Sequence, residues 1–139
     1  MKKRLCFALL CLLSVSSILL SACKNEQEKM DEVQKTALIQ GLKTVILFKS
    51  QMSAYYAENQ VCSENAISNV DRILTKVHYV EGVIATDKCQ IILTFKKDVS
   101  IPDISRQQII LTMTPGPSTH KWTCESTTRR KDLLPRECR

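Results

Sequence analysis

The chain has 139 residues, of which 44% are hydrophobic, 5% aromatic and 24% charged, with a formal net charge of +6. This length leaves room for one small domain with a single core, and the few aromatic residues mean that the core must be mainly aliphatic. Because the sequence has no internal repeats and no low-complexity tracts, we predict no second domain.

Residues 1–22 have the three parts of a secretory signal. A positively charged end is followed by an apolar stretch from Leu5 to Leu20 and by two small residues. The sequence Leu20-Ser21-Ala22-Cys23 resembles the lipobox of bacterial lipoproteins, in which the cysteine receives acyl chains such as palmitate and cleavage follows. We therefore predict a lipid anchor on Cys23. An ordinary signal peptide and a transmembrane helix are the alternatives, although the apolar stretch is short for a bilayer of about 30 Å.

The residue after the cysteine bears on which membrane holds the protein, and removal of the signal peptide lowers the net charge of the mature chain. In lipoproteins an aspartate at this position favours the inner membrane, so Lys24 favours the outer membrane of a Gram-negative envelope. Residues 1–22 contain three basic residues and no acidic one, so the mature chain has 17 Lys and Arg against 14 Asp and Glu. The net charge is then +3, which weakens the case for general nucleic-acid binding.

The polar residues 23–29 are predicted to form a lipidated tether, and residues 30–139 a single domain. From about Met30 to Asn59 the apolar residues recur at three- and four-residue steps, which predicts a long amphipathic helix. Its apolar stripe comprises Val33, Ala37, Leu38, Gly41, Leu42, Val45, Phe48, Met52, Tyr55 and Tyr56. Because Ile39, Ile46 and Leu47 lie outside the centre of this stripe, the helix packs either against a wide sheet or against a second partner as well.

The rest of the chain is predicted to form one short helix and four strands. Residues 63–77 have helical spacing after Ser63, a favourable N-cap residue. Strand patterns cover residues 80–85, 90–95, 109–114 and 121–125, with a hairpin turn at residues 86–89. The fold class is therefore α+β, with a long N-terminal helix packed on a four-stranded antiparallel meander. The residues from Ser126 onward form a charged loop.

The cysteine count predicts two disulfides. Two of the seven cysteines lie in the signal peptide and Cys23 is assigned to the lipid. An even number remains in an exported chain, which favours disulfides over zinc, since there is no CxxC pair and neither histidine lies at ligand spacing. These four are Cys62, Cys89, Cys124 and Cys138. Of the three possible pairings, the local one, Cys62–Cys89 and Cys124–Cys138, fits the predicted elements best.

The body of the chain, roughly residues 30–139, resembles the globular part of a type IV pilin. The most specific signal is Trp122-Thr123-Cys124 followed by Leu134-Pro135-Arg136-Glu137-Cys138, which is similar to the W-x-C … L-P-x-x-C ending of pilins. The resemblance implies a pilin-like roll in which the last two cysteines enclose a loop displayed on the outer surface. In that family the loop includes receptor, adhesin and DNA-binding variants.

The sequence departs from the pilin pattern in its N-terminal part. Pilins begin with a short basic leader, a glycine and a cleavage site, and then the apolar half of the helix builds the filament core. Here the apolar stretch precedes Cys23, no glycine occurs before Gly41, and Arg106 stands where pilins commonly have glycine. We therefore expect a lipid in place of the polymerising half-helix, and no ordinary incorporation into a pilus.

The residues outside the core suggest binding rather than catalysis. No Ser/His/Asp or Cys/His set is present, so no catalytic residue, metal or cofactor is predicted. The basic residues Arg129, Arg130, Lys131 and Arg136 form a candidate binding loop, with Arg139 at its base and Lys96-Lys97 as a possible extension. A solubilising loop tip is the simpler interpretation. Trp122, Tyr55 and Tyr56 are expected to pack in or on the core.

Three functional hypotheses follow. The first is a non-enzymatic, lipid-anchored accessory subunit that binds pilins or the pilus machinery. The second is a module that presents the basic loop to DNA or another anion, and the third is a surface adhesin. We favour the first, because the apolar shoulder of the helix lacks its usual neighbours.

Overall fold

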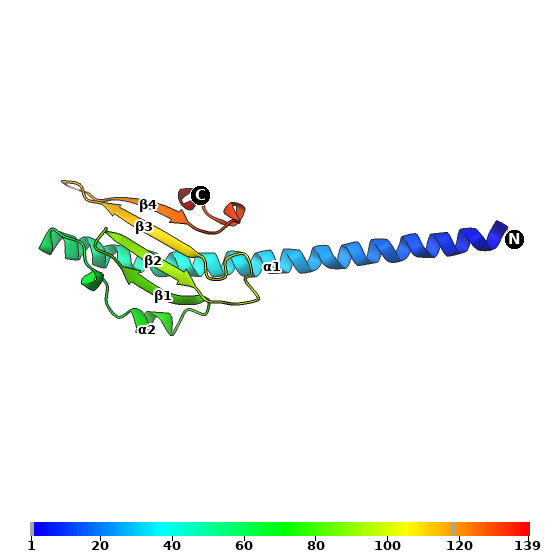
Figure 1. Ribbon diagram of the computed structural model, residues 1–139, viewed down its shortest axis with the longest axis horizontal. Coiled ribbons are helices and arrows are strands. Elements are labelled where there is room, and N and C mark those ends of the chain that lie inside the picture. Colours follow the sequence, from blue (N-terminus) through cyan, green and yellow to red (C-terminus); the bar gives the residue numbers. More distant parts are fainter. Residues whose placement is uncertain (1, 118) are drawn as a thin grey trace. The chain divides into compact units, whose positions relative to one another are not determined.

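The computed structural model describes residues 2–117 and 119–139, and their side chains from residue 25 onward. In chain order the elements are α1 (Lys2–Asn59), η1 (Glu64–Ala66), α2 (Val70–Leu74), β1 (Val80–Ala85), β2 (Gln90–Phe95), β3 (Gln108–Thr114), β4 (Lys121–Ser126), η2 (Lys131–Leu133) and η3 (Arg136–Cys138) (Figure 1). The chain divides into two compact units, residues 1–32 and residues 33–139.

The first unit consists of helix. Helix α1 begins earlier than the predicted start near Met30, because no proline or glycine interrupts the chain before Gly41. The predicted tether of residues 23–29 is therefore helical, and Gln27 Nε2 donates a hydrogen bond to Asp31 Oδ1 at 3.0 Å one turn further on. Of the helices searched over the described residues, none is long and apolar enough to cross a membrane.

The predicted signal peptide and lipid anchor fall within the first unit. The side chains of residues 1–22 and of Cys23 lie outside those that the structure describes. Both assignments, and the boundaries that depend on them, stay predictions.

The second unit is the predicted α+β fold. Within residues 33–139, the strands form one antiparallel sheet in the order β1-β2-β3-β4, and α1 packs against one face of it (Figure 1). Each strand matches its predicted range to within one residue. In β2 and β3 every second side chain is buried toward the helix, as a two-residue period requires.

The core is the aliphatic layer that the composition requires. The helix contributes Ala37, Leu38, Val45, Phe48 and Met52, and the sheet contributes Val83, Ile91, Leu93, Phe95, Ile109, Leu111 and Met113. Gly41 lets the two layers approach closely, since a Cβ atom at this position would lie 2.8 Å from Cζ of Phe95. Tyr55 and Tyr56 pack against the edge of this core, as expected.

The helix predicted over residues 63–77 is wrong at both ends, because α2 spans only Val70–Leu74. Ser63 is an N-cap, but it caps only the short η1, where its Oγ accepts from the backbone N–H of Asn65 at 3.2 Å. Helix α2 begins at Val70, because Asn69 adopts a left-handed conformation with φ 57°. The backbone N–H of Ser68 donates to Oε1 of Gln51 at 2.7 Å, which ties the break to α1.

The expected burial of Trp122 is also only partly correct. Strand β4 is an edge strand, so the indole is half-buried rather than enclosed. Lys49 of α1 places its Nζ over the ring, 5.1 Å from the ring centroid. The indole is therefore part of a surface next to α1.

Candidate interaction surface

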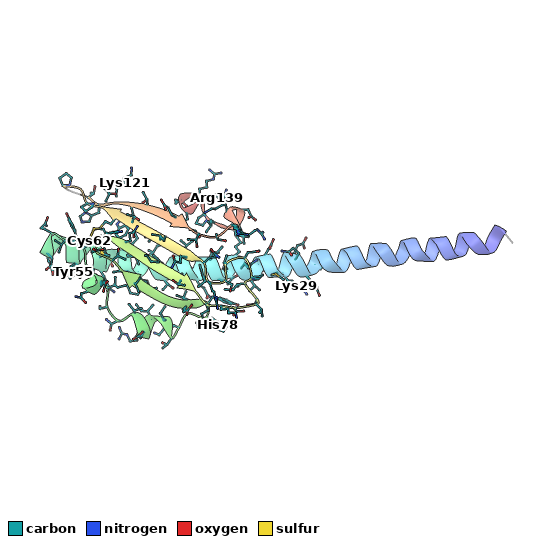
Figure 2. All side chains as sticks on the ribbon, in the orientation of Figure 1. Lys29, Tyr55, Cys62, His78, Lys121 and Arg139 are labelled. Carbon is teal, nitrogen blue, oxygen red and sulfur yellow. A yellow bond between two sulfur atoms is a disulfide. The ribbon has the colours of Figure 1, made fainter. Side chains whose placement is uncertain are left out.

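The C-terminal loop folds back against the domain. A disulfide joins Cys124 in β4 to Cys138 in η3, and the other disulfide joins Cys62 to Cys89, so the cysteines form the local pairs. Leu134 is buried in the core, and its carbonyl accepts from Nε of Arg139 at 2.9 Å. Arg139 and Lys121 lie on the same side of the domain, along β4 (Figure 2). The loop is thus a packed part of the second unit.

A polar network joins this loop to α1. The buried Gln34 donates from Nε2 to Oδ2 of Asp103 at 3.0 Å, and its Oε1 accepts from the backbone N–H of Asp103 at 2.8 Å. The same Asp103 oxygen accepts from Nη1 of Arg130 at 3.1 Å. Thr128 adds a hydrogen bond from Oγ1 to the Asp103 carbonyl at 3.2 Å. Asp103 therefore connects the helix, the β2–β3 connection and the loop.

Arg130 also forms a bidentate pair with Asp132. Its Nε and Nη2 donate to the two carboxylate oxygens at 2.9 and 2.8 Å. The hydrogen bond from Arg130 lowers the pKa of the Asp132 carboxyl below its ordinary value, since it favours the charged form. The guanidinium is consequently engaged by two carboxylates at once.

This arrangement changes the meaning of the predicted basic cluster. Arg129, Lys131 and Arg136 are exposed, but Arg130 is half-buried and paired. Lys131 is held too, because its Nζ donates to the carbonyl of Ser126 at 2.6 Å. The loop does not present its cations as one free patch, so its role in DNA or anion binding stays a prediction without support from this geometry.

The exposed face of α1 carries large apolar side chains. Ile39, Ile46 and Leu47 are 44%, 55% and 56% exposed, although the opposite face of the same helix is fully buried. Ile39, half-buried Leu42 and Ile46 follow one another at steps of three and four residues, so they form a ridge along the helix. The sequence pattern indicated this shoulder but not what lies next to it.

Two hollows adjoin this ridge on the side of the C-terminal loop. One, of about 390 Å³, lies between Ile39 and Leu42 of α1 and Leu133, Leu134 and Pro135 of the loop. The other, of about 410 Å³, is bordered by Leu42, Ile46, Trp122 and Pro135. Because both share Leu42, Ile46 and Pro135, they form one trough with a largely apolar floor. We call it the α1 trough.

Cations frame the α1 trough. Lys35, Lys43 and Lys49 of α1 line it, together with Arg139 from the end of the chain. The sequence from Val33 to Ala57 contains these three lysines and no acidic residue. The acidic residues along the trough are Asp132, which pairs with Arg130, and Glu137. The frame therefore favours an acidic partner.

Nothing in the described part of the chain forms a metal centre. Over these residues no group of three or more His, Cys, Asp or Glu side chains could hold an ion. The four described cysteines that the sequence assigned to disulfides are used in them. The α1 trough is the hollow that combines an exposed apolar ridge with a frame of cations.

Comparison with known proteins identifies the domain. A family model described as pilin, a bacterial filament protein, matches residues 35–139. The chain belongs to the pilin family. The match covers α1 from Lys35 onward, the whole sheet and the C-terminal loop, so the fold and the family agree. No curated protein matches the chain.

Membership of the pilin family indicates the general class of protein to which this domain belongs. Pilins are structural, non-enzymatic proteins of the bacterial surface or envelope, and they associate with pilus subunits. The C-terminal disulfide loop of the resemblance is the loop enclosed by Cys124–Cys138. In this pilin the loop also forms one wall of the α1 trough.

Proposed function

We propose that this protein is a lipid-anchored accessory pilin that binds pilin subunits or the pilus machinery and is not an ordinary filament subunit. The pilin match over residues 35–139 supports the pilus connection. The exposed apolar ridge of α1, with Ile39 and Ile46, is the observation that carries the binding role, because such a surface on a small domain marks an interaction site.

The anchoring part of the proposal rests on the Leu20-Ser21-Ala22-Cys23 sequence. Acyl chains on Cys23 would hold the domain at a membrane, since each buried CH₂ contributes roughly 0.8 kcal/mol. Lys24 favours the outer membrane as the destination. A lipid in place of the apolar half-helix leaves the pilin domain able to meet subunits but without the segment that drives lateral association.

The test is the Cys23→Ser variant of the full chain, expressed in the native bacterium. We expect loss of metabolic labelling with palmitate, loss of the protein from the outer-membrane fraction and an altered number of surface pili. The Cys11→Ser variant is the matched control, because it removes a signal-peptide thiol without touching the lipidation site, and it should behave like the wild type.

A different outcome would overturn the proposal. If the Cys23→Ser protein stays in the membrane and appears in sheared filaments, the protein is an incorporated minor pilin and not a lipoprotein. If labelling is lost, but deletion of the protein leaves the pilus number unchanged and no pilin co-purifies with the wild-type protein, the accessory role is wrong.

A further inference from the structure

The α1 trough has a shape that selects among possible partners. The trough lies between the ridge of α1 and the packed C-terminal loop, and half-buried Leu42 and exposed Ile46 line it on the α1 side. A flat bilayer surface could touch the exposed side chains of this ridge, but it would not fill the recess between the ridge and the C-terminal loop. A helix laid parallel to α1 can place apolar side chains in it, since residues three and four apart share one face.

The charges along the trough determine which charged side chains a partner helix should carry beside its apolar stripe. Lys35 and Lys43 are exposed on α1, Lys49 lies further along, and Arg139 faces them from the loop side. Carboxylates beside the apolar stripe of a partner would meet these cations, whereas lysines there would be repelled. Nucleic acid fits less well, because the lining is largely apolar and the tryptophan ring is already engaged by the Lys49 ammonium.

We propose that the α1 trough docks an acidic amphipathic helix of a partner protein, with the partner's apolar stripe against Leu42 and Ile46 and its Glu or Asp side chains against Lys35 and Lys43. The proposal deepens the accessory function, on which it rests for its setting in the cell, by naming the chemistry of the partner. Binding itself is a property of the trough and can be measured without the envelope.

Trp122 provides the readout, because it is the only tryptophan in the chain and borders the trough. The probes are two synthetic peptides of about 20 residues, long enough to form a helix and without tryptophan. Both have the same apolar stripe at steps of three and four residues, and the flanking positions are Glu in one peptide and Lys in the other. The full chain in detergent is titrated with each while Trp122 fluorescence is recorded.

We expect saturable binding of the Glu peptide that weakens as the salt concentration rises, and at least about tenfold weaker binding of the Lys peptide. Ile46→Asp and the double variant Lys35→Glu/Lys43→Glu should each weaken binding of the Glu peptide by about tenfold or more. These side chains are exposed or line the trough, so the fold should tolerate their replacement. Lys49 is left unchanged because it contacts the reporter.

Matched controls place the same chemical changes elsewhere. Ile84→Asp changes an exposed isoleucine of β1, and Lys88→Glu changes an exposed lysine of the β1–β2 turn. Both should bind the Glu peptide like the wild type. Equal binding of the two peptides, or equal loss in the control variants, would overturn the proposal.

Two other occupants are distinguished by separate measurements. Binding to phosphatidylglycerol vesicles that Ile46→Asp abolishes, without binding of the Glu peptide, would make the trough a membrane-contacting surface and refute the helix. Concentration-dependent dimers abolished by the same variant would assign the trough to a second copy of this chain. If the peptide does not bind but Cys23→Ser still changes pilus number, the accessory function stands and only the docking proposal fails.

Discussion

Gln34 and Asp103 exchange two hydrogen bonds between α1 and the connection from β2 to β3. The Gln34 amide donates to the carboxylate at 3.0 Å and accepts from the backbone N–H of Asp103 at 2.8 Å. Gln34 is fully buried and Asp103 is partly exposed, so the bonds are part-buried, and through Asp103 they also connect to Arg130 of the C-terminal loop. This pair joins the three parts of the pilin domain on which the α1 trough depends.

We expect Gln34→Met to lower the free energy of unfolding by about 2–3 kcal/mol. The variant keeps the approximate volume but removes the amide that the Asp103 N–H and one carboxylate oxygen bind. The carboxylate keeps Arg130 as a partner, so the cost comes mainly from the Asp103 N–H, which loses its acceptor. Urea unfolding of the full chain, followed by Trp122 fluorescence, measures the effect. Gln40→Met, at an exposed position of the same helix, should change stability little. Equal stability of both variants would show that the pair is dispensable.

Arg106 has a left-handed backbone conformation with φ 60°, at the position where the resemblance to pilins leads us to expect glycine. A residue with a Cβ atom is strained there, whereas glycine is not. We expect Arg106→Gly to raise the free energy of unfolding by about 0.5–1 kcal/mol, visible as a higher thermal midpoint. Arg106→Ala removes the charge but keeps the Cβ atom, so it should give no such gain. A gain in the alanine variant would assign the effect to charge instead.

The Cys124–Cys138 disulfide joins residues 14 apart in sequence, and closing a loop of this size stabilises a fold by about 3 kcal/mol. We expect the double variant Cys124→Ser/Cys138→Ser to lose about this much, measured by guanidinium unfolding under oxidising conditions. Hydrogen exchange should speed up in η3 and in Leu134. Adding a reductant should bring the wild type to the stability of a variant that lacks both disulfides.

The Arg130–Asp132 pair should make the loop acid-sensitive. The folded-state pKa of Asp132 lies below its ordinary value of 3.8, so the carboxylate stabilises the fold above that value, and the contribution is lost as the pH falls through the lowered pKa. We expect Asp132→Asn to have a lower urea midpoint than the wild type at about pH 6, with the difference shrinking as the pH falls below 3.8 and through the lowered pKa. A difference that persists in acid would mean that the carboxylate charge is not the cause.

Much of the second unit could be predicted from local pattern. The four strands, the end of α1 and the buried stripe of the helix follow from two- and 3.6-residue periods, and these periods are properties of the backbone. The break before α2 was missed because it depends on a left-handed Asn69 and on Gln51 of α1, which is 17 residues from Ser68. No local period reports such a contact.

The candidate surface, too, was predictable where it depends on local sequence pattern and not where it depends on contacts between distant residues. The sequence marked Ile39 and Ile46 as apolar residues outside the main stripe, and it marked the cations of the C-terminal loop. It could not show that Arg130 turns to Asp103 and Asp132, since the first of these carboxylates comes from a connection 27 residues away. The basic loop therefore became a wall of the trough and not a displayed patch.

The sequence by itself determined the fold class, the pilin resemblance and the prediction of a lipid on Cys23, because these depend on composition, periodicity and short motifs. Only the tertiary structure decided which cations are paired and which frame the α1 trough. That outcome depends on packing α1, the sheet and a disulfide-closed loop against one another, and such packing brings together side chains that lie far apart in the chain.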